Sequence, residues 1–198
     1  MILGVIPARY QSSRLPGKPL ADIGGIPMIL HTYRSALKSK LLDKICVAVD
    51  DERVKAVIEE NGGWAEMTPV EVPTGSDRIA LIAKKYPEAK IIVNIQGDEP
   101  FISGKMIDEA IEPLLFDQTV QVSTLAKKIK DSSEFLSPAA VKVVFDYNNF
   151  AMYFSRSPIP YVRDAGTPEK MLKCADIYKH IGLYVYRNEA LVKFTILE

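Results

Sequence analysis

Residues 2–19 read ILGVIPARYQSSRLPGKP, a short aliphatic run followed directly by a cationic loop. The run at 2–6 is typical of a strand that is buried on both faces of a parallel sheet. The loop carries three fixed cations, Arg9, Arg14 and Lys18, and no acidic residue. This local excess predicts a bound polyanion, and a triphosphate fits because backbone N–H groups and guanidinium donors can share its oxygens. The alternative is a solvated loop whose arginines face water.

The loop matches neither of the common glycine-rich phosphate motifs. Gly17-Lys18 is followed by Pro19 and lacks a glycine five positions earlier, so the loop is not a Walker A sequence. No G-x-G-x-x-G opens a helix either. Neither motif therefore accounts for the loop.

Outward from the first strand, short apolar runs alternate with amphipathic stretches. The runs predicted to be buried strands are 2–6, 44–49, 91–95 and 120–126. The helices between them are expected to start at Pro27 and at caps on Asp51, Ser76 and Ser103, and to end near Leu37, Gly62-Gly63, Lys85 and Leu115. This alternation predicts an α/β protein, a three-layer α/β/α sandwich with a mostly parallel central sheet. Such folds bind ligands where the strands end.

The second half of the chain has a different pattern. Residues 141–146 and 150–155 flank Tyr147-Asn148-Asn149, which predicts a β-hairpin. A loop containing proline and glycine is expected at 157–174, and 180–187 alternates like a half-buried strand. We expect these strands to form a small antiparallel subdomain.

Composition limits the function classes. The chain has 25 basic and 25 acidic residues, and this neutrality argues against a general binder of nucleic acid or of anionic membranes. Cys46 and Cys174 show no C-x-x-C spacing, and no signal peptide or membrane-spanning run is visible, so a cytoplasmic location is expected. With only His31 and His180 in the chain, zinc is not expected.

A second motif, Gln96-Gly97-Asp98-Glu99-Pro100, follows the run at 91–95. An acid beyond the end of a buried strand, after a glycine that permits close backbone approach, suits a hard cation. Asp98 is therefore the candidate magnesium ligand and Glu99 a weaker one. A strand-ending turn with solvated acids explains the spacing as well.

Two further motifs allow both a functional and a structural interpretation. Residues 73–78, PTGSDR, start a helix whose N–H groups favour an anion or a polar base edge, although plain capping explains them equally. Downstream, Arg156, His180 and Tyr184 could bind an acidic, hydroxylated substrate, although a histidine at a strand start is more often structural.

Together these segments resemble one family, the 3-deoxy-manno-octulosonate (KDO) cytidylyltransferases, or CMP-KDO synthetases. The matching pieces are IPARYQSSRLPGKPL at 6–20, PTGSDRI at 73–79, VNIQGDEPFI at 93–102, AVKVV at 140–144, YFSRSPIP at 153–160 and HIGLYVYR at 180–187. The first piece is shared in outline with other sugar nucleotidyltransferases, including sialic-acid synthetases. The QGDEP, FSRSPIP and HIGLYVYR pieces are more specific.

The resemblance implies a nucleotide-diphospho-sugar transferase (Rossmann-like) fold and a magnesium-dependent reaction. CTP and the eight-carbon acid sugar KDO would give CMP-KDO and pyrophosphate, for lipopolysaccharide assembly in a Gram-negative cytoplasm. It implies one domain over 1–198, with a nucleotide-binding core at 1–140 and a sugar-binding and dimerisation subdomain at 141–187. A homodimer is expected, with its contact region between about Asp146 and Arg187.

The resemblance also implies roles for individual residues. Those expected at the nucleotide and its phosphates are Ala8, Arg9, Arg14, Lys18, Thr74, Gly75 and Arg78. Those expected at the sugar acid are Gln96, Arg156, His180 and Tyr184, with Asp98 on Mg²⁺. Arg14, Lys18 and Asp98 form the expected catalytic set.

One departure from the family affects the expected activity. Family members continue for several tens of residues beyond the equivalent of Glu198, and that part carries a second aspartate for magnesium. We therefore expect weak or absent turnover by these 198 residues. The alternatives are a sialic-acid-type CMP-sugar synthetase, a nucleotide-binding fragment without catalysis, and a purely structural role, which leaves the cation cluster unexplained.

Overall fold

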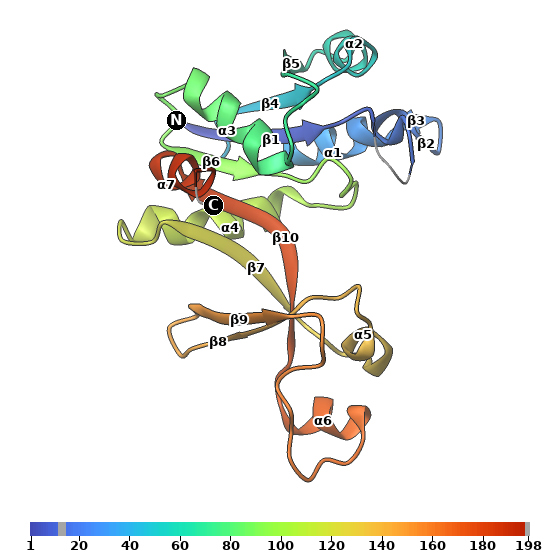
Figure 1. Ribbon diagram of the computed structural model, residues 1–198, viewed down its shortest axis with the longest axis vertical. Coiled ribbons are helices and arrows are strands. Elements are labelled where there is room, and N and C mark those ends of the chain that lie inside the picture. The colour runs from blue at the N-terminus through green and yellow to red at the C-terminus, as the bar shows by residue number, and fades with distance from the viewer. Residues whose placement is uncertain (12–14, 197–198) are drawn as a thin grey trace. The chain divides into compact units, whose positions relative to one another are not determined.

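The computed structural model describes residues 1–11 and 15–196. Arg14, one of the predicted phosphate ligands, lies outside the described residues. The chain forms two compact units, Met1–Ser123 together with Leu183–Glu198, and Thr124–Gly182 (Figure 1). The chain therefore passes between the units twice, along two long strands.

The first unit is built on a mostly parallel sheet with the strand order β5-β4-β1-β6-β10. The strands are β1 (Ile2–Ala8), β4 (Lys44–Val49), β5 (Trp64–Met67), β6 (Ile91–Asn94) and β10 (Tyr178–Arg187). Neighbours from β5 to β6 pair in parallel, whereas β10 pairs with β6 in the antiparallel direction, with Tyr184 opposite Asn94. A two-stranded sheet, β2 (Asp22–Ile23) and β3 (Ile26–Pro27), and a short 3-10 helix, η1 (Lys18–Leu20), follow the cationic loop.

Helices cover both faces of this sheet, which gives the predicted three-layer α/β sandwich (Figure 1). They are α1 (Met28–Ala36), α2 (Glu52–Glu60), α3 (Gly75–Lys85), α4 (Gly104–Phe116) and α7 (Asn188–Phe194). Strand β1 shows the reason, because successive side chains point to opposite faces. Leu3 and Val5 pack with α3 and α7, whereas Ile6 lies beside Ile29 of α1.

Two of the three predicted helix caps are the capping residues in the structure. Asp51 caps α2, where its side chain accepts from the Arg53 backbone N–H at 2.9 Å, and Ser103 caps α4. The predicted cap on Ser76 is wrong. Helix α3 starts earlier, because the Thr74 hydroxyl accepts from the Asp77 N–H at 3.1 Å while the Asp77 carboxylate accepts from the Thr74 N–H. This capping box satisfies two backbone donors at once.

The second unit contains the predicted hairpin. Strands β8 (Lys142–Phe145) and β9 (Ala151–Ser155) pair in the antiparallel direction, and β10 continues beside β8. Strand β7 (Val122–Lys128) also pairs with β10. The Asp146 carboxylate closes the hairpin turn by accepting from the backbone N–H groups of Asn148 and Phe150, each at 2.9 Å.

Two helices of the second unit were not predicted. They are α5 (Ser132–Leu136) and α6 (Pro168–Cys174). The loop expected over 157–174 therefore ends at residue 167, because Thr167 caps α6 and Pro168 occupies its first turn. Cys174 closes a helix instead of lying in a loop.

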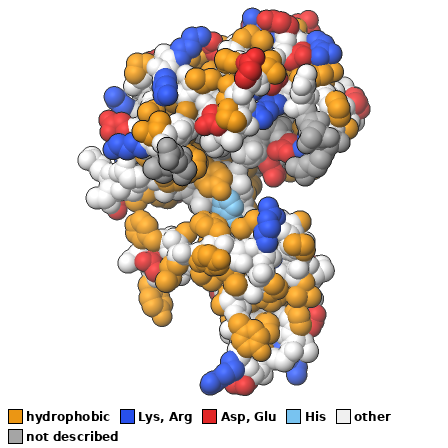
Figure 2. Space-filling model, viewed as in Figure 1, with side chains coloured by type: hydrophobic (Ala, Val, Ile, Leu, Met, Phe, Trp, Pro, Cys, Tyr) orange, Lys and Arg blue, Asp and Glu red, His pale blue; other side chains and the backbone are white. Residues whose placement is uncertain are grey.

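This unit has a small core and an apolar surface. Ile129, Phe135 and Ile177 form its buried cluster. Hydrophobic side chains occupy much of its visible face in Figure 2, and on β9 the exposed fractions of Met152 and Tyr153 are 72% and 63%. Within the described part of the chain, no helix is long and apolar enough to cross a membrane.

Candidate nucleotide-binding site

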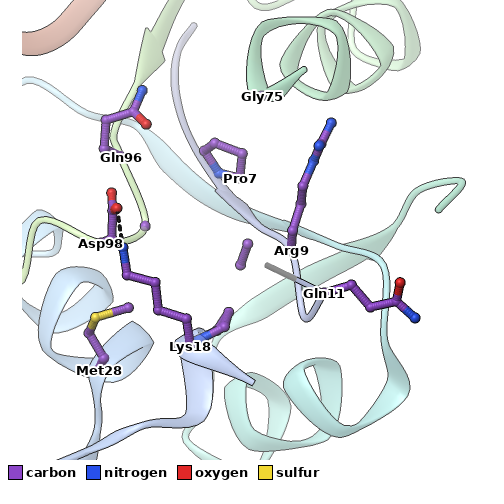
Figure 3. Close-up of a pocket in the computed structure, with 11 residues that line it drawn as sticks. Pro7, Arg9, Gln11, Lys18, Met28, Gly75, Gln96 and Asp98 are labelled. Carbon is purple, nitrogen blue, oxygen red and sulfur yellow. Dashed lines mark hydrogen bonds and ion pairs between the residues drawn. The ribbon is translucent and has the colours of Figure 1, made fainter. Parts of the chain in front are cut away.

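A pocket of about 350 Å³ lies at the carboxyl ends of β1 and β6 (Figure 3). This is the edge of a parallel sheet where the sequence analysis expected a ligand. The lining residues are Pro7, Ala8, Arg9, Gln11, Lys18, Pro19, Met28, Gly75, Gln96, Gly97 and Asp98. The structure therefore brings together the cationic loop, the QGDEP segment and the start of α3.

Close backbone packing places Asp98 in the pocket. A Cβ atom added at Gly97 would lie 2.6 Å from the carbonyl oxygen of Pro7, so only glycine lets the segment after β6 lie against the end of β1. The buried hydroxyl of Thr32 on α1 donates to the carbonyl of Gly97 at 3.2 Å. These two contacts fix the backbone that carries the Asp98 carboxylate.

The charges of the pocket include one ion pair. Nζ of Lys18 lies 2.5 Å from Oδ2 of Asp98, shown by the dashed line in Figure 3. The exposed fractions of these side chains are 36% and 48%, and ion pairs at such exposed positions contribute only about 0–1 kcal/mol. The pair can therefore separate at little cost when a phosphate approaches Lys18 or a cation approaches Asp98.

Arg9 extends from the end of β1 toward the start of α3 (Figure 3). Its Nη2 donates to the carbonyl of Val72, while its Nε is buried and has no hydrogen-bond partner among the described atoms. A buried donor without a partner is costly, and an incoming acceptor would relieve that cost. The N-terminal end of α3, at Gly75, adds the positive end of the helix dipole to the same side of the pocket.

Arg78, expected at the nucleotide, is buried and does not line this pocket. Its exposed fraction is 0%, its Nη2 lies 3.1 Å from Oδ2 of Asp50, and its Nη1 donates to the Thr68 hydroxyl. Thr74, also expected at the nucleotide, is the capping residue next to Gly75. A direct contact between Arg78 and cytidine remains a prediction.

The residues expected at the sugar acid are divided between the units. In the first unit, Gln96 lines the pocket and its Nε2 donates to Oδ1 of Asn94 at 3.1 Å. Tyr184 lies opposite Asn94 on β10, and burial raises the pKa of its phenol. Gln96 and Tyr184 thus both neighbour the end of β6.

In the second unit, Arg156 is exposed and its Nη1 donates to the carbonyl of Pro138 at 2.7 Å. Nε2 of His180 lies 2.7 Å from the Thr124 hydroxyl, and the edge of its ring packs against Phe154. Burial lowers the pKa of His180, which favours the neutral imidazole at pH 7. A neutral imidazole can form a hydrogen bond with a hydroxyl group, as His180 does with Thr124.

Some residues at or beside the pocket were not identified from the sequence. Pro7, Gln11 and Met28 line it without carrying a charge that would single them out. Asp50, which pairs with Arg78, did carry a usable signal. It directly follows β4, as an acid beyond the end of a buried strand, and the same argument identified Asp98.

The described residues include no group of three or more histidine, cysteine or acidic side chains that could hold a metal ion. Asp98 offers a single carboxylate to the pocket, and Glu99 lies next to it in the chain. Magnesium is often held by one or two carboxylates with phosphate and water oxygens completing its coordination. The donor set fits a cation that arrives with a triphosphate.

The α/β sandwich and a cation-lined pocket at its strand ends define the class, an α/β protein that binds an anionic ligand such as a nucleotide. Comparisons with known proteins refine this class. The cytidylyltransferase family model matches residues 3–198. The 3-deoxy-manno-octulosonate cytidylyltransferase of Geotalea uraniireducens is 49% identical over 197 residues, which are 98% of this chain and 78% of that protein. The enzyme of the same name from Geobacter sulfurreducens is 46% identical with the same coverage.

A solved structure of CMP:2-keto-3-deoxy-manno-octonic acid synthetase complexed with CTP superimposes with a TM-score of 0.91 at 41% identity. It covers all of this chain, which spans 79% of that one. A cytidylyltransferase from Leptospira borgpetersenii, 19% identical with a TM-score of 0.62, shares the fold. The chain therefore belongs to the 3-deoxy-manno-octulosonate cytidylyltransferase family.

Proposed function

We propose that this protein transfers CMP from CTP to 3-deoxy-D-manno-octulosonate, giving CMP-KDO and pyrophosphate. The observation that carries the proposal is the pocket in which Arg9, Lys18 and Asp98 meet at the ends of β1 and β6. The relatives named for this reaction, 49% and 46% identical, support the same assignment.

The cations of the first loop would hold the triphosphate. Lys18 would exchange its pairing with Asp98 for a phosphate oxygen, and the unpartnered Nε of Arg9 would donate to the nucleotide. Arg14 would join them by its place in the motif. Transfer at phosphorus depends mainly on positioning and on neutralising charge that builds up on the leaving pyrophosphate, which these groups would supply.

Asp98 would hold Mg²⁺ through its carboxylate. The bound cation would neutralise charge on the phosphate oxygens. Glu99, the next residue, is the weaker candidate and provides a matched control, because both carboxylates are exposed.

The nucleoside would lie toward the start of α3. Ala8 and Arg9 come from the end of β1, and Thr74 and Gly75 from the first turn of the helix. Polar groups at a helix N-terminus suit the polar edge of a pyrimidine or an oxygen of the ribose. Specificity for cytosine is part of the proposal and is tested below.

The acid sugar would be bound by Gln96, Arg156, His180 and Tyr184. A guanidinium such as Arg156 suits the sugar carboxylate, and the neutral imidazole of His180 suits a hydroxyl. The anomeric hydroxyl oxygen would form a bond to the α-phosphorus as the bond between that phosphorus and the bridging oxygen of pyrophosphate breaks. The hydroxyl proton would pass to solvent water, and pyrophosphate would leave with the electron pair of the broken bond.

The proposed setting is lipopolysaccharide biosynthesis in the cytoplasm, with the protein acting as a homodimer. The exposed apolar side chains of β9, Met152, Tyr153 and Phe154, support a contact with a second copy within the segment 146–187. Sedimentation at micromolar concentration would show a species of twice the chain mass if this contact forms.

The test is pyrophosphate release with protein in excess over nucleotide, so that slow turnover is still detected. Each of the four nucleoside triphosphates is supplied with Mg²⁺, alone, with KDO or with N-acetylneuraminate. Release only from CTP with KDO is expected. Release with N-acetylneuraminate instead, equal release from all four nucleotides, or binding of none of them would contradict the proposal.

The metal assignment has its own control. Asp98→Asn is expected to lower the rate by about 100-fold or more, because the carboxylate that would hold Mg²⁺ against the phosphates is lost. Glu99→Gln should retain a rate within about threefold of the unmodified protein. A larger loss of rate for Glu99→Gln than for Asp98→Asn would identify Glu99, and not Asp98, as the metal ligand.

A further inference from the structure

Asp50 lies outside the set of pocket residues, yet it contacts the base of the cationic loop. It directly follows β4, and Val49, the last residue of β4, is paired with Ala8 at the end of β1. The Asp50 side chain has an exposed fraction of only 5%. Its Oδ1 accepts from the backbone N–H of Tyr10 at 2.8 Å. A nearly buried carboxylate therefore holds the first turn of the loop.

Tyr10 is the point where both ends of the loop meet. The carbonyl of Tyr10 accepts from the N–H of Gly17 at 2.8 Å, so the loop is closed at its base. Gly17 has a φ of +71°, which favours glycine, and its Cα faces the Tyr10 phenol. Arg9 precedes this junction and Lys18 follows it, so the position of Tyr10 sets the position of both cations.

Asp50 is in turn fixed by Arg78. Oδ2 of Asp50 lies 3.1 Å from Nη2 of the fully buried Arg78 guanidinium. Burial lowers the pKa of Arg78, and the charge of Asp50 opposes that shift. Arg78 belongs to α3, whose first residue, Gly75, lines the pocket. The pair thus links the side of the pocket at α3 to the loop at the end of β1.

We propose that Asp50, held by Arg78, is a positioning residue that sets the cationic loop for the nucleotide phosphates. This rests on the proposed function of the same pocket. Asp50 does not line the pocket and acts through the Tyr10 N–H. Its loss should therefore weaken binding of the triphosphate while leaving binding of cytidine, which lacks phosphates, nearly unchanged.

Single substitutions at this pair would leave one charge buried alone and so risk unfolding the protein. Two double variants avoid this. Asp50→Asn with Arg78→Gln keeps a carbonyl oxygen for the Tyr10 N–H and removes both charges. Asp50→Leu with Arg78→Gln removes both charges and also the acceptor. Because both variants carry glutamine at position 78, the comparison between them isolates the hydrogen bond to Tyr10.

Affinities for CTP, tripolyphosphate and cytidine are measured by calorimetry. Urea unfolding first shows that each variant is folded. The Leu/Gln variant should bind both triphosphates about tenfold more weakly than the Asn/Gln variant, since one buried hydrogen bond is lost. Cytidine affinity should differ by less than about twofold. If the Leu/Gln variant does not fold, Asp50→Ser with Arg78→Gln replaces it, because serine is too short to reach Tyr10.

Equal triphosphate affinities in the two variants would overturn the inference, as would an equal loss for cytidine and triphosphates. These outcomes are distinct from failure of the proposed function. That failure would appear as an unmodified protein that binds none of the nucleoside triphosphates.

Discussion

Adding one methyl group at Gly97 would separate the two segments that form the nucleotide pocket. The new Cβ would lie 2.6 Å from the carbonyl oxygen of Pro7, 3.4 Å from Cδ1 of Ile29 and 3.5 Å from Cγ2 of Ile6. The closest of these atoms is backbone in the central strand of the sheet. It cannot move without disturbing β1, so the segment that carries Asp98 must move instead.

The size of the effect follows from these contacts. Ordinary contact begins near 3.4 Å, so the backbone after β6 must shift by about 0.8 Å. Overpacking of this kind typically costs about 1–3 kcal/mol, equivalent to a fall in melting temperature of roughly 2–12 °C for a chain of this length. A displacement of about 1 Å at a reacting site can lower the rate by roughly 100-fold. Gly97→Ala should therefore reduce both stability and activity.

The assay combines thermal unfolding with CTP binding in the presence and absence of Mg²⁺. The gain in CTP affinity that Mg²⁺ provides should shrink, because Asp98 is displaced. Gly75→Ala is the stability control, since its Cβ would lie 3.6 Å from Cγ of Pro7, an ordinary contact. Its free energy of unfolding should lie within about 1 kcal/mol of that of the unmodified protein. An unchanged melting temperature and an unchanged effect of Mg²⁺ for Gly97→Ala would refute the reasoning.

Three further predictions concern the same two units. Thr32→Val leaves the carbonyl of Gly97 without its donor and should lower the free energy of unfolding, measured with urea, by about 1–3 kcal/mol. Thr32→Ser keeps the hydroxyl and should retain most of the stability, so equal losses in the two variants would show that the hydroxyl does not matter. Lys18→Met should weaken CTP binding by about 10- to 100-fold, because a charged phosphate ligand is lost. The free energy of unfolding should change by less than about 1 kcal/mol, because the ion pair of Lys18 with Asp98 is half-exposed. A large loss of stability would contradict this. His180 has a lowered pKa, so the unfolded chain takes up a proton first as the pH falls, and stability should decline below about pH 6.5 by at most about 1.4 kcal/mol per pH unit. His180→Gln should flatten that slope, and an unchanged slope would argue against the assigned cause.

The architecture of the first unit was predictable because its strands are short, aliphatic and buried on both faces. The sequence predicted ligand-binding loops at one edge of the sheet, and the parallel pairing of β1 with β6 explains why Lys18 and Asp98 meet there. Strand β5 was missed, since Trp64–Met67 is brief and mixes apolar and charged residues. Local pattern alone carries little signal for such a strand.

Errors at helix ends had a local cause. Ser76 and Thr74 are both good caps, and only the reciprocal bond from Asp77 selects Thr74. The proline and glycine residues before α6 favour a loop by composition, whereas Thr167-Pro168 is by its position a helix start.

The burial of Arg78 could not be predicted from the motif. An arginine in the first turn of a helix beside a pocket is expected to face the ligand, whereas the partners of Arg78 are the nearly buried carboxylate of Asp50 and the hydroxyl of Thr68. Buried ion pairs join residues far apart in sequence, here on β4's end and α3. A single sequence without pairing information does not reveal them.

The most direct test of the central claim is ³¹P NMR of CTP, Mg²⁺ and KDO with stoichiometric protein. Transfer at the α-phosphorus predicts loss of the three CTP resonances and the appearance of one phosphodiester signal, from CMP-KDO, with one pyrophosphate signal. CTP resonances that neither broaden nor decline with stoichiometric protein, or signals of CDP with inorganic phosphate, would contradict the account.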